Sequence, residues 1–268
     1  WSPEEAELTC AGAAQAGFGL LELPLLDPSS YDVAMTSSAL RRHGLTAACS
    51  LGLDLDADIS SPDPNVSSRG EARLEEALAV AAGVGATHLT GVIYSALEKY
   101  PSKPTPLGRA ACVSALRRLA RSAAASGVTL GLEAVNRYES NLVNTAAQAA
   151  GLCEDVAEPN VVVHLDSYHM NIEEASMARA VADAGGWLGY VHVGESHRGA
   201  LGTGQCDVDG LLGALHGAGY SGPVVFESFS SKVVSKDLSD RLCVWRDMWD
   251  DSSELALSAR EYIRERLC

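Results

Sequence analysis

The sequence predicts a (β/α)8 barrel, the TIM barrel fold, as a single domain over residues 1–268. Short apolar runs rich in Val, Ile and Leu recur every few dozen residues, and Ala-rich stretches with helical spacing separate them. This alternation is typical of parallel strands joined by helices. The length of 268 residues suits one barrel or two small domains, and no linker divides the chain. An open doubly wound sheet is the structural alternative, but nothing resembles its Gly-rich first turn.

Seven segments are expected to be strands. Each is a short apolar run, and several carry a polar residue near the end. The segments are GLLELPLL from Gly19, TAACSLGL from Thr46, HLTGVIYS from His88, TLGLEAVN from Thr129, VVVHLDSY from Val161, LGYVHVGE from Leu188 and PVVFESF from Pro223.

Eight segments with helical spacing lie before, between and after these runs. They cover residues 3–17, 31–43, 69–85, 107–127, 144–157, 172–184, 208–217 and 239–266. Eight helices beside seven strands leave a closed barrel one strand short, and the sequence opens directly in a helix. The simplest explanation is a first strand just upstream of Trp1 that is missing from this sequence.

Charge and composition restrict the partners that we expect. The 35 Asp and Glu residues against 20 Lys and Arg give a net charge of −15, which repels nucleic acid and anionic membrane surfaces. There is no apolar run of about 18 residues and no signal-like start, so we expect a cytoplasmic protein. The seven scattered cysteines lack a Cys-x-x-Cys pair and are expected to be small buried side chains in a reducing compartment.

Polar residues collect where the expected strands end. In a parallel barrel the carboxyl ends of the strands carry the catalytic groups. Glu133, Asp166, His192 and Glu227 each interrupt an otherwise hydrophobic strand segment. An unpaired carboxylate in such a place would cost several kcal/mol. Three carboxylates and one imidazole brought to one axial point suit a divalent ion such as Mn²⁺, Mg²⁺ or Co²⁺, which would neutralise the cluster.

The other histidines and one glycine-rich loop have ordinary structural interpretations. His43, His88 and His216 are expected at the surface, while His164 is expected to pack between barrel and helices. The GALGTGQ segment, which begins at Gly199, lacks the lysine of a phosphate-binding P-loop. It is expected to be a loop over the site.

Six motifs carry a resemblance to a known family. They are GLEAVNRYESNLVNT at Gly131, HLDSYHMNIEE at His164, GYVHVGESHRGALGTG at Gly189, GPVVFESF at Gly222, DISSPDP at Asp58 and VWRDMW at Val244. With these motifs the sequence resembles the D-tagatose 3-epimerase, D-allulose (psicose) 3-epimerase and L-ribulose 3-epimerase family of xylose-isomerase-like barrels. The resemblance covers essentially the whole chain.

The resemblance implies one divalent metal ion per subunit, most often Mn²⁺, bound by Glu133, Asp166, His192 and Glu227. The ion would chelate the C2 carbonyl oxygen and C3 hydroxyl of a free ketose and stabilise an enediolate. Glu133 and Glu227 would be the catalytic pair, one removing the C3 proton and the other returning a proton to the opposite face.

The resemblance also implies how the sugar is held and how the protein assembles. Glu139, His169 and Arg198 would bind the O1 to O3 end of the ketose. Without the resemblance, Arg198 could equally pair with surface acids. Leu97 stands where several relatives carry tryptophan, which leaves the preference at C4 to C6 open. A homodimer or homotetramer is expected.

Other functions compete with the 3-epimerase. An aldose–ketose or hydroxypyruvate-type isomerase would use similar ligands on the same barrel to move a proton between C1 and C2. A non-catalytic sugar-binding protein would retain the barrel without the chemistry, but all seven implied positions are filled. A multi-zinc abasic-site endonuclease would need more histidines and a basic DNA-binding face, and the net charge argues against it.

Overall fold

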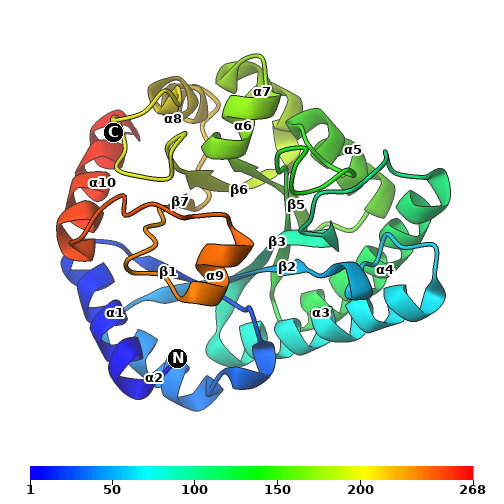
Figure 1. The fold of residues 1–268 in the computed structure, drawn as a ribbon, viewed down its shortest axis with the longest axis horizontal. Helices are drawn as coiled ribbons and strands as arrows, with labels where there is room; N and C mark the ends of the chain where they lie inside the picture. The colour runs from blue at the N-terminus through cyan, green and yellow to red at the C-terminus, as the bar shows by residue number, and fades with distance from the viewer. Residues whose placement is uncertain (268) are drawn as a thin grey trace.

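Seven parallel strands form the centre of the protein in a computed structural model that describes residues 1–267 (Figure 1). They are β1 (Leu20–Pro24), β2 (Thr46–Leu53), β3 (Ala86–Ala96), β4 (Thr129–Glu133), β5 (Val161–Asp166), β6 (Leu188–Val193) and β7 (Val224–Phe226). Each strand pairs with the next one along the chain, so the sheet order is β1 to β7. All seven expected strands are confirmed, and the sheet is a nearly closed α/β barrel.

The barrel is open between its first and last strands. Within residues 1–267, β1 pairs only with β2 and β7 pairs only with β6. A groove of about 1030 Å³ lies along this opening, and its walls include Leu21 of β1 and Val224 of β7. A strand upstream of Trp1 stays a prediction.

Helices surround the strands (Figure 1). The α-helices are α1 (Pro3–Gln15), α2 (Val33–Arg42), α3 (Pro64–Val84), α4 (Pro106–Ala125), α5 (Ala146–Val156), α6 (Ser167–Glu173), α7 (Met177–Ala184), α8 (Val208–Gly217), α9 (Lys236–Arg241) and α10 (Ser252–Leu267). Three 3₁₀ turns accompany them, namely η1 (Pro28–Ser30), η2 (Leu55–Ala57) and η3 (Gly185–Trp187). Within the described part of the chain, no helix is long and apolar enough to cross a membrane.

Helix caps explain two differences from the expected boundaries. The helix expected from residue 69 begins at Pro64, because the Asp63 carboxylate accepts a hydrogen bond from Asn65 N–H at 2.8 Å and proline suits the first helical position. The helix expected over 172–184 is two helices, α6 and α7. Helix α6 begins directly after β5, because the Asp166 carboxylate caps it by accepting from Tyr168 N–H at 2.8 Å.

The helix expected over 239–266 is also wrong, because α9 and α10 are separate. Helix α9 ends before Cys243, whose φ of 55° lies in the left-handed region. The following segment is held by Trp249, whose indole N–H donates to Ser228 Oγ at 2.8 Å. Figure 1 shows α9, in orange, in front of the strands rather than in the outer ring.

The core consists mainly of aliphatic side chains between the strands and the helices. Four of the cysteines are buried as expected, namely Cys10, Cys49, Cys112 and Cys153. Cys206 is half-buried and Cys243 is exposed, so the expectation was wrong for the latter. Cys268 lies outside the described residues.

We predict that replacing Tyr94 of β3 by phenylalanine will destabilise the protein by about 1–2 kcal/mol. The fully buried Tyr94 hydroxyl lies 2.7 Å from the carbonyl oxygen of Glu133 and 3.2 Å from that of Val143. Its loss removes a buried donor from the Glu133 carbonyl and leaves the Val143 carbonyl with only the longer hydrogen bond from Val135 N–H at 3.4 Å. Urea unfolding measures the change. Tyr138→Phe is the matched control, because Tyr138 is 58% exposed, and a cost equal to that of Tyr94→Phe would contradict this account.

Candidate metal centre and active site

The four predicted metal ligands lie at the carboxyl ends of four consecutive strands. Glu133 ends β4 and Asp166 ends β5, while His192 lies in β6 and Glu227 directly follows β7. Asp166 pairs directly with His192, while Glu133 pairs with His164 and Glu227 lies two residues after Val225, the β7 partner of His192, so Glu133 and Glu227 each lie two positions along the strands from the Asp166–His192 pair. Because alternate side chains face the same side of a strand, these groups point into the barrel. Glu133, His192 and Glu227 line a cavity of about 240 Å³, and the fully buried Asp166 lies beside them.

Three overlapping groups of ligand atoms connect these residues. In each group the atoms lie within 4.8 Å of one another. The groups are Glu133, His164 and His192; Glu133, Asp166 and His169; and Asp166, His192 and Glu227. His192 Nδ1 lies 3.6 Å from Glu227 Oε1 and 3.9 Å from Glu133 Oε1. The four predicted metal ligands therefore lie close together. They are divided among three overlapping groups of three residues and do not form one group of four.

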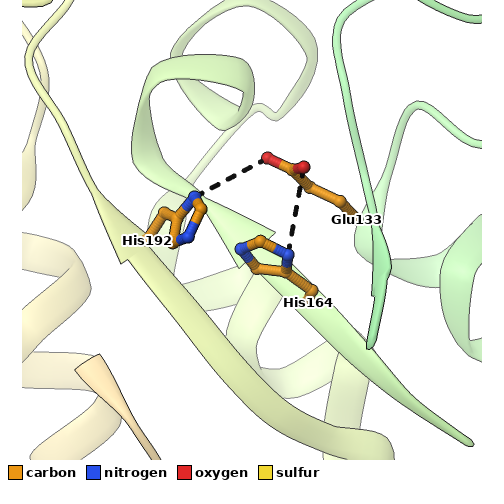
Figure 2. A group of neighbouring side chains, drawn as sticks. All are labelled: Glu133, His164 and His192. Carbon is orange, nitrogen blue, oxygen red and sulfur yellow. Dashed lines mark ion pairs between the residues drawn. The ribbon is translucent and has the colours of Figure 1, made fainter. Parts of the chain in front are cut away.

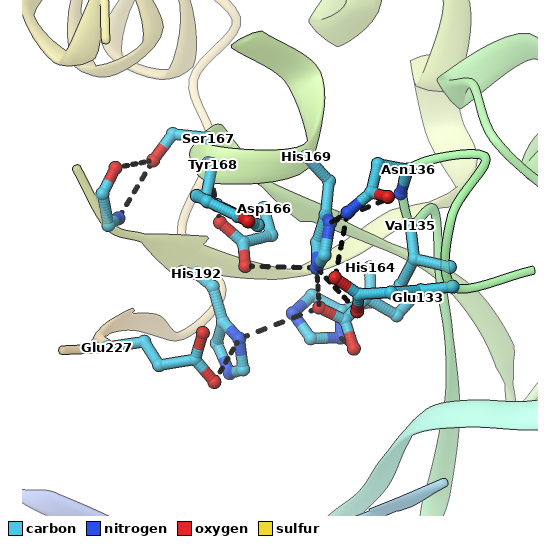
Figure 3. Close-up of polar contacts among 12 residues, drawn as sticks. Glu133, Val135, Asn136, His164, Asp166, Ser167, Tyr168, His169, His192 and Glu227 are labelled. Carbon is cyan, nitrogen blue, oxygen red and sulfur yellow. Dashed lines mark hydrogen bonds and ion pairs between the residues drawn. The ribbon is translucent and has the colours of Figure 1, made fainter. Parts of the chain in front are cut away.

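A buried nitrogen without a partner suggests a missing positive charge. Among the described residues, His192 Nδ1 has no hydrogen-bond partner, although it is buried. Figure 2 shows it directed at Glu133, and Figure 3 shows it beside Glu227. A buried polar atom left unpaired is costly, and a cation beside two carboxylates would be a suitable partner for it. The residues present therefore fit a divalent ion.

The carboxylates of the cluster are held out of water. Burial raises the pKa of Glu133 well above its usual range, and the neighbouring Asp166 and Glu227 raise it further, while His192 opposes the shift. Burial and Glu227 also raise the pKa of Asp166 to about 6, against the opposing effect of Arg198 and His192. Because these carboxylates lie close together and are shielded from water, either protonation of a carboxylate or a bound cation is favoured.

Arg198 is a buried part of this cluster and not a surface ion pair. Its guanidinium bonds Glu227 and lies 3.3 Å from Asp166 Oδ2. It also stacks 3.6 Å above the ring of Tyr168. The residue has a φ of 64°, a conformation that is uncommon outside glycine, and Ser228 Oγ donates to its carbonyl oxygen at 2.6 Å. The loop backbone therefore holds this arginine toward the cavity.

Asn136 orients His169 so that the ring can act as a hydrogen-bond donor. His169 Nδ1 accepts from the backbone N–H of Asn136 at 3.2 Å and lies 2.9 Å from Asn136 Nδ2, as Figure 3 shows. The hydrogen must then be on Nε2, which lies 3.7 Å from both Glu133 Oε1 and Asp166 Oδ2. Burial lowers the pKa of His169 well below its usual value, so the ring is neutral.

Glu139 joins the same arrangement through Asn136. The Asn136 Nδ2 amide donates to Glu139 Oε1 at 2.8 Å, and Glu139 Oε2 lies 3.9 Å from His169 Nε2. Burial raises the pKa of Glu139, with Arg198 opposing the shift. All three residues predicted to bind the sugar, Glu139, His169 and Arg198, line the cavity. The supporting role of Asn136 was not predicted from the sequence.

His164 does not pack between the barrel and the helices as expected. It is fully buried and points into the barrel, where its ring centre lies 4.2 Å from that of His192 (Figure 2). The reason is strand periodicity, because His164 and Asp166 are two residues apart and share the inner face. Its Nδ1 lies 2.7 Å from Thr90 Oγ1, and His164 is not among the described residues that line the cavity.

Glu22 of β1 is a site residue that sequence reasoning missed. Its Oε2 accepts hydrogen bonds from Tyr190 at 2.6 Å and from His192 Nε2 at 2.8 Å. Burial alone would raise the pKa of Glu22, but His192 and these hydrogen bonds outweigh burial and lower it to about 2. The signal was an acidic residue inside the first apolar strand segment, the same signal that marked Glu133 and Glu227.

The rest of the cavity wall is largely apolar. It includes Leu26, Leu51, Leu97, Phe229, Leu238 and Leu242. The last two of these side chains come from α9 and the residue after it. Arg241 attaches this helix to the end of β2, because its guanidinium donates to Gly52 O at 2.9 Å and lies 3.0 Å from Asp54 Oδ1. Leu97 is one of these apolar residues, so the cavity wall has an aliphatic side chain at the position where several relatives were expected to have tryptophan.

Two backbone amides in and directly after the glycine-rich segment that follows β6 are bound by a carboxylate of the protein itself. The buried carboxylate of Glu195 accepts from Gly202 N–H at 2.9 Å and from Cys206 N–H at 3.3 Å. Glu195 thus satisfies amides that a phosphate cradle would leave available. None of residues 199–205 is among the described residues that line the cavity, so the expected position of this loop over the site stays a prediction.

Comparison with known proteins identifies relatives along almost the whole chain. An L-ribulose 3-epimerase of Methylomonas sp. (strain DH-1) is 47% identical over 99% of this chain and 93% of the relative. A ketose 3-epimerase of Arthrobacter globiformis is 50% identical over 94% of this chain and 88% of the relative. Epimerases are isomerases, and the chain is accordingly an enzyme of that class.

A solved structure and a family model agree with this result. A crystal structure of D-allulose 3-epimerase from Methylomonas sp. in complex with D-allulose superposes with a TM-score of 0.96 at 47% identity, covering 99% of this chain and 92% of that one. The family model described as a xylose isomerase-like TIM barrel matches residues 10–264. The predicted barrel is confirmed, and the chain belongs to the xylose isomerase-like TIM barrel family.

Proposed function

We propose that this enzyme is a metal-dependent ketose 3-epimerase that inverts C3 of a free ketohexose or ketopentose. One observation carries the proposal: Glu133 and Glu227 come from separate strands, β4 and β7, and both lie within 4 Å of His192 Nδ1 in one cavity. Inversion needs two proton-transfer groups that reach opposite faces of the reacting carbon. The activities for which the relatives are named, and the D-allulose bound in the related crystal structure, support a ketose as the substrate.

A divalent cation would be held by Glu133, Asp166, His192 and Glu227. Three carboxylates and one imidazole suit Mn²⁺, Mg²⁺ or Co²⁺. Such an ion would supply positive charge next to the sugar oxygens on which negative charge develops when the C3 proton leaves.

The side chains of the protein would transfer the protons and bind the sugar. One of Glu133 and Glu227 removes the C3 proton, and the other supplies a proton from the opposite side. The direction of reaction decides which glutamate has which role. The His169 Nε2–H and the Arg198 guanidinium donate hydrogen bonds to sugar oxygens near the reacting carbon. Glu139 accepts a hydrogen bond from a sugar hydroxyl.

The charge of the cavity favours an unphosphorylated sugar. Its two arginines are both engaged, since Arg198 pairs with Asp166 and Glu227, and Arg241 pairs with Asp54. No lysine is among the described residues that line the cavity. A phosphate group there would meet acidic side chains without a free cationic partner.

We predict that Mn²⁺-loaded protein will convert D-fructose, D-allulose, D-tagatose or L-ribulose into the C3 epimer and exchange the C3 hydrogen with solvent. Two acid–base groups in contact with water allow such exchange. Chromatography identifies the product, and proton NMR in D₂O locates the exchanged position. Aldose products with label at C1 or C2 would instead establish the isomerase alternative.

Glu227→Gln should lower kcat by at least about 10³-fold, because the amide cannot transfer the proton. The matched control is Glu98→Gln, which removes the same charge from an exposed position after β3 that does not line the cavity. The control should retain full activity. Equal activity of Glu227→Gln and wild type would refute the proposed catalytic pair.

We predict that metal-free protein becomes less stable as pH rises from about 4 to about 7. The pKa of Asp166 is 3.8 when unperturbed and about 6 in the fold, so the folded state holds this proton more tightly than the unfolded state does. The cost of ionising it is absent below about pH 4, and it is fully present above about pH 6. The Asp166→Asn variant should therefore gain on the order of 3 kcal/mol relative to wild type over this range.

Urea unfolding in the presence of a chelator measures this difference at each pH. Added Mn²⁺ should stabilise wild type more at pH 7.5 than at pH 5, because the ion binds the ionised carboxylates. A stability difference between Asp166→Asn and wild type that does not change with pH would contradict the prediction.

A further inference from the structure

Glu22 approaches the candidate metal centre from a strand that carries none of the predicted ligands. Strand β1 lies at the edge of the sheet and does not pair with β6, yet Glu22 Oε2 reaches two side chains of β6 across the barrel. These are the Tyr190 hydroxyl at 2.6 Å and His192 Nε2 at 2.8 Å. Both distances are those of strong hydrogen bonds to a carboxylate.

The hydrogen bond to Glu22 decides which nitrogen of His192 can bind a cation. A carboxylate accepts hydrogen bonds, so Nε2 must carry a hydrogen toward Glu22. In the neutral ring, Nδ1 then has the free electron pair. This is the atom that is buried without a hydrogen-bond partner in the described structure and that lies within 4 Å of Glu133 and Glu227.

The second contact of Glu22 restricts its own position. Tyr190 is fully buried and lies two residues before His192 on the same face of β6. Its hydroxyl donates to the same Oε2 atom that accepts from His192. Tyr190 therefore holds the Glu22 carboxylate in place while the carboxylate orients His192.

We propose that Glu22 is a positioning residue that holds His192 as the Nε2–H tautomer and aims Nδ1 at the bound cation. The inference rests on the proposed function, because it requires His192 to be a metal ligand. Carboxylates that accept a hydrogen bond from a ligating histidine orient the ring and make it a stronger ligand, and their loss commonly weakens metal binding 10–100-fold.

The test is calorimetric titration of Mn²⁺ into metal-free Glu22→Gln, with wild type and Glu98→Gln as references. A glutamine lacks the charge and can turn its amide toward the ring, so the Kd for Mn²⁺ should rise about 10–100-fold. Glu98→Gln should bind as wild type does. The visible spectrum of the Co²⁺-loaded protein should also shift in Glu22→Gln only, because it reports the ligand field of the bound ion.

A structural role would give a different result. If Glu22 only supported the fold, metal-free Glu22→Gln would melt at a lower temperature, while its Kd for Mn²⁺ stayed within about twofold of wild type and its Co²⁺ spectrum was unchanged. That outcome overturns the inference and leaves the proposed function intact, provided that wild type binds Mn²⁺ and forms the C3 epimer. Wild-type protein that binds no divalent cation overturns both.

A measurement on wild type avoids dependence on the variant. Nitrogen-15 NMR of Mg²⁺-loaded protein labelled at histidine distinguishes the two ring nitrogens. We expect the His192 Nε2 to carry hydrogen and Nδ1 to show the shift of a ligating nitrogen. Hydrogen on Nδ1 in the loaded protein would overturn the proposal even if Glu22→Gln could not be folded.

Discussion

The placement of acidic side chains inside the end of a hydrophobic barrel is the constraint on which the rest of the site depends. Glu133 and Asp166 are less than 10% exposed, and Glu22 and Glu227 lie in the same cavity. Carboxylates so close together raise each other's cost of ionisation in a medium that screens poorly. The site therefore needs positive charge at this point, and Arg198 and His192 are placed to provide some of it.

Two basic groups partly meet this need. Arg198 pairs with Asp166 and Glu227, and His192 lies near both Glu133 and Glu227. This compensation is incomplete, because the pKa of Asp166 is still raised to about 6 and His192 Nδ1 has no hydrogen-bond partner in the described structure. A bound divalent ion would supply the missing charge, and the electrostatic cost of the unneutralised carboxylates would then contribute to the affinity for the ion.

Sequence patterns predicted the strands correctly and indicated the candidate ligands, because both predictions depend on local contrast between polar and apolar residues. An acid inside an apolar run stands out, and parallel topology brings the ends of such runs together. The pairing of Glu22 with His192 depends on contact across the barrel between residues 170 positions apart, which no local pattern records. The break between α9 and α10 was missed for a similar reason, since the intervening chain is held by tertiary contacts such as that of Trp249 with Ser228.

Histidine roles were the hardest to predict, because a sequence gives the residue and not the hydrogen bonds that select its tautomer. Glu22 accepts from His192 Nε2 and leaves Nδ1 with the electron pair that a cation requires. Asn136 donates to His169 Nδ1 and leaves Nε2 with the hydrogen that a sugar oxygen can accept. The acceptor Glu22 thus leaves His192 with a free electron pair toward the cavity, whereas the donor Asn136 leaves His169 with an N–H group. The proposed assignment of His192 to the metal and of His169 to the substrate therefore rests on these partners, which come from β1 and from the loop after β4.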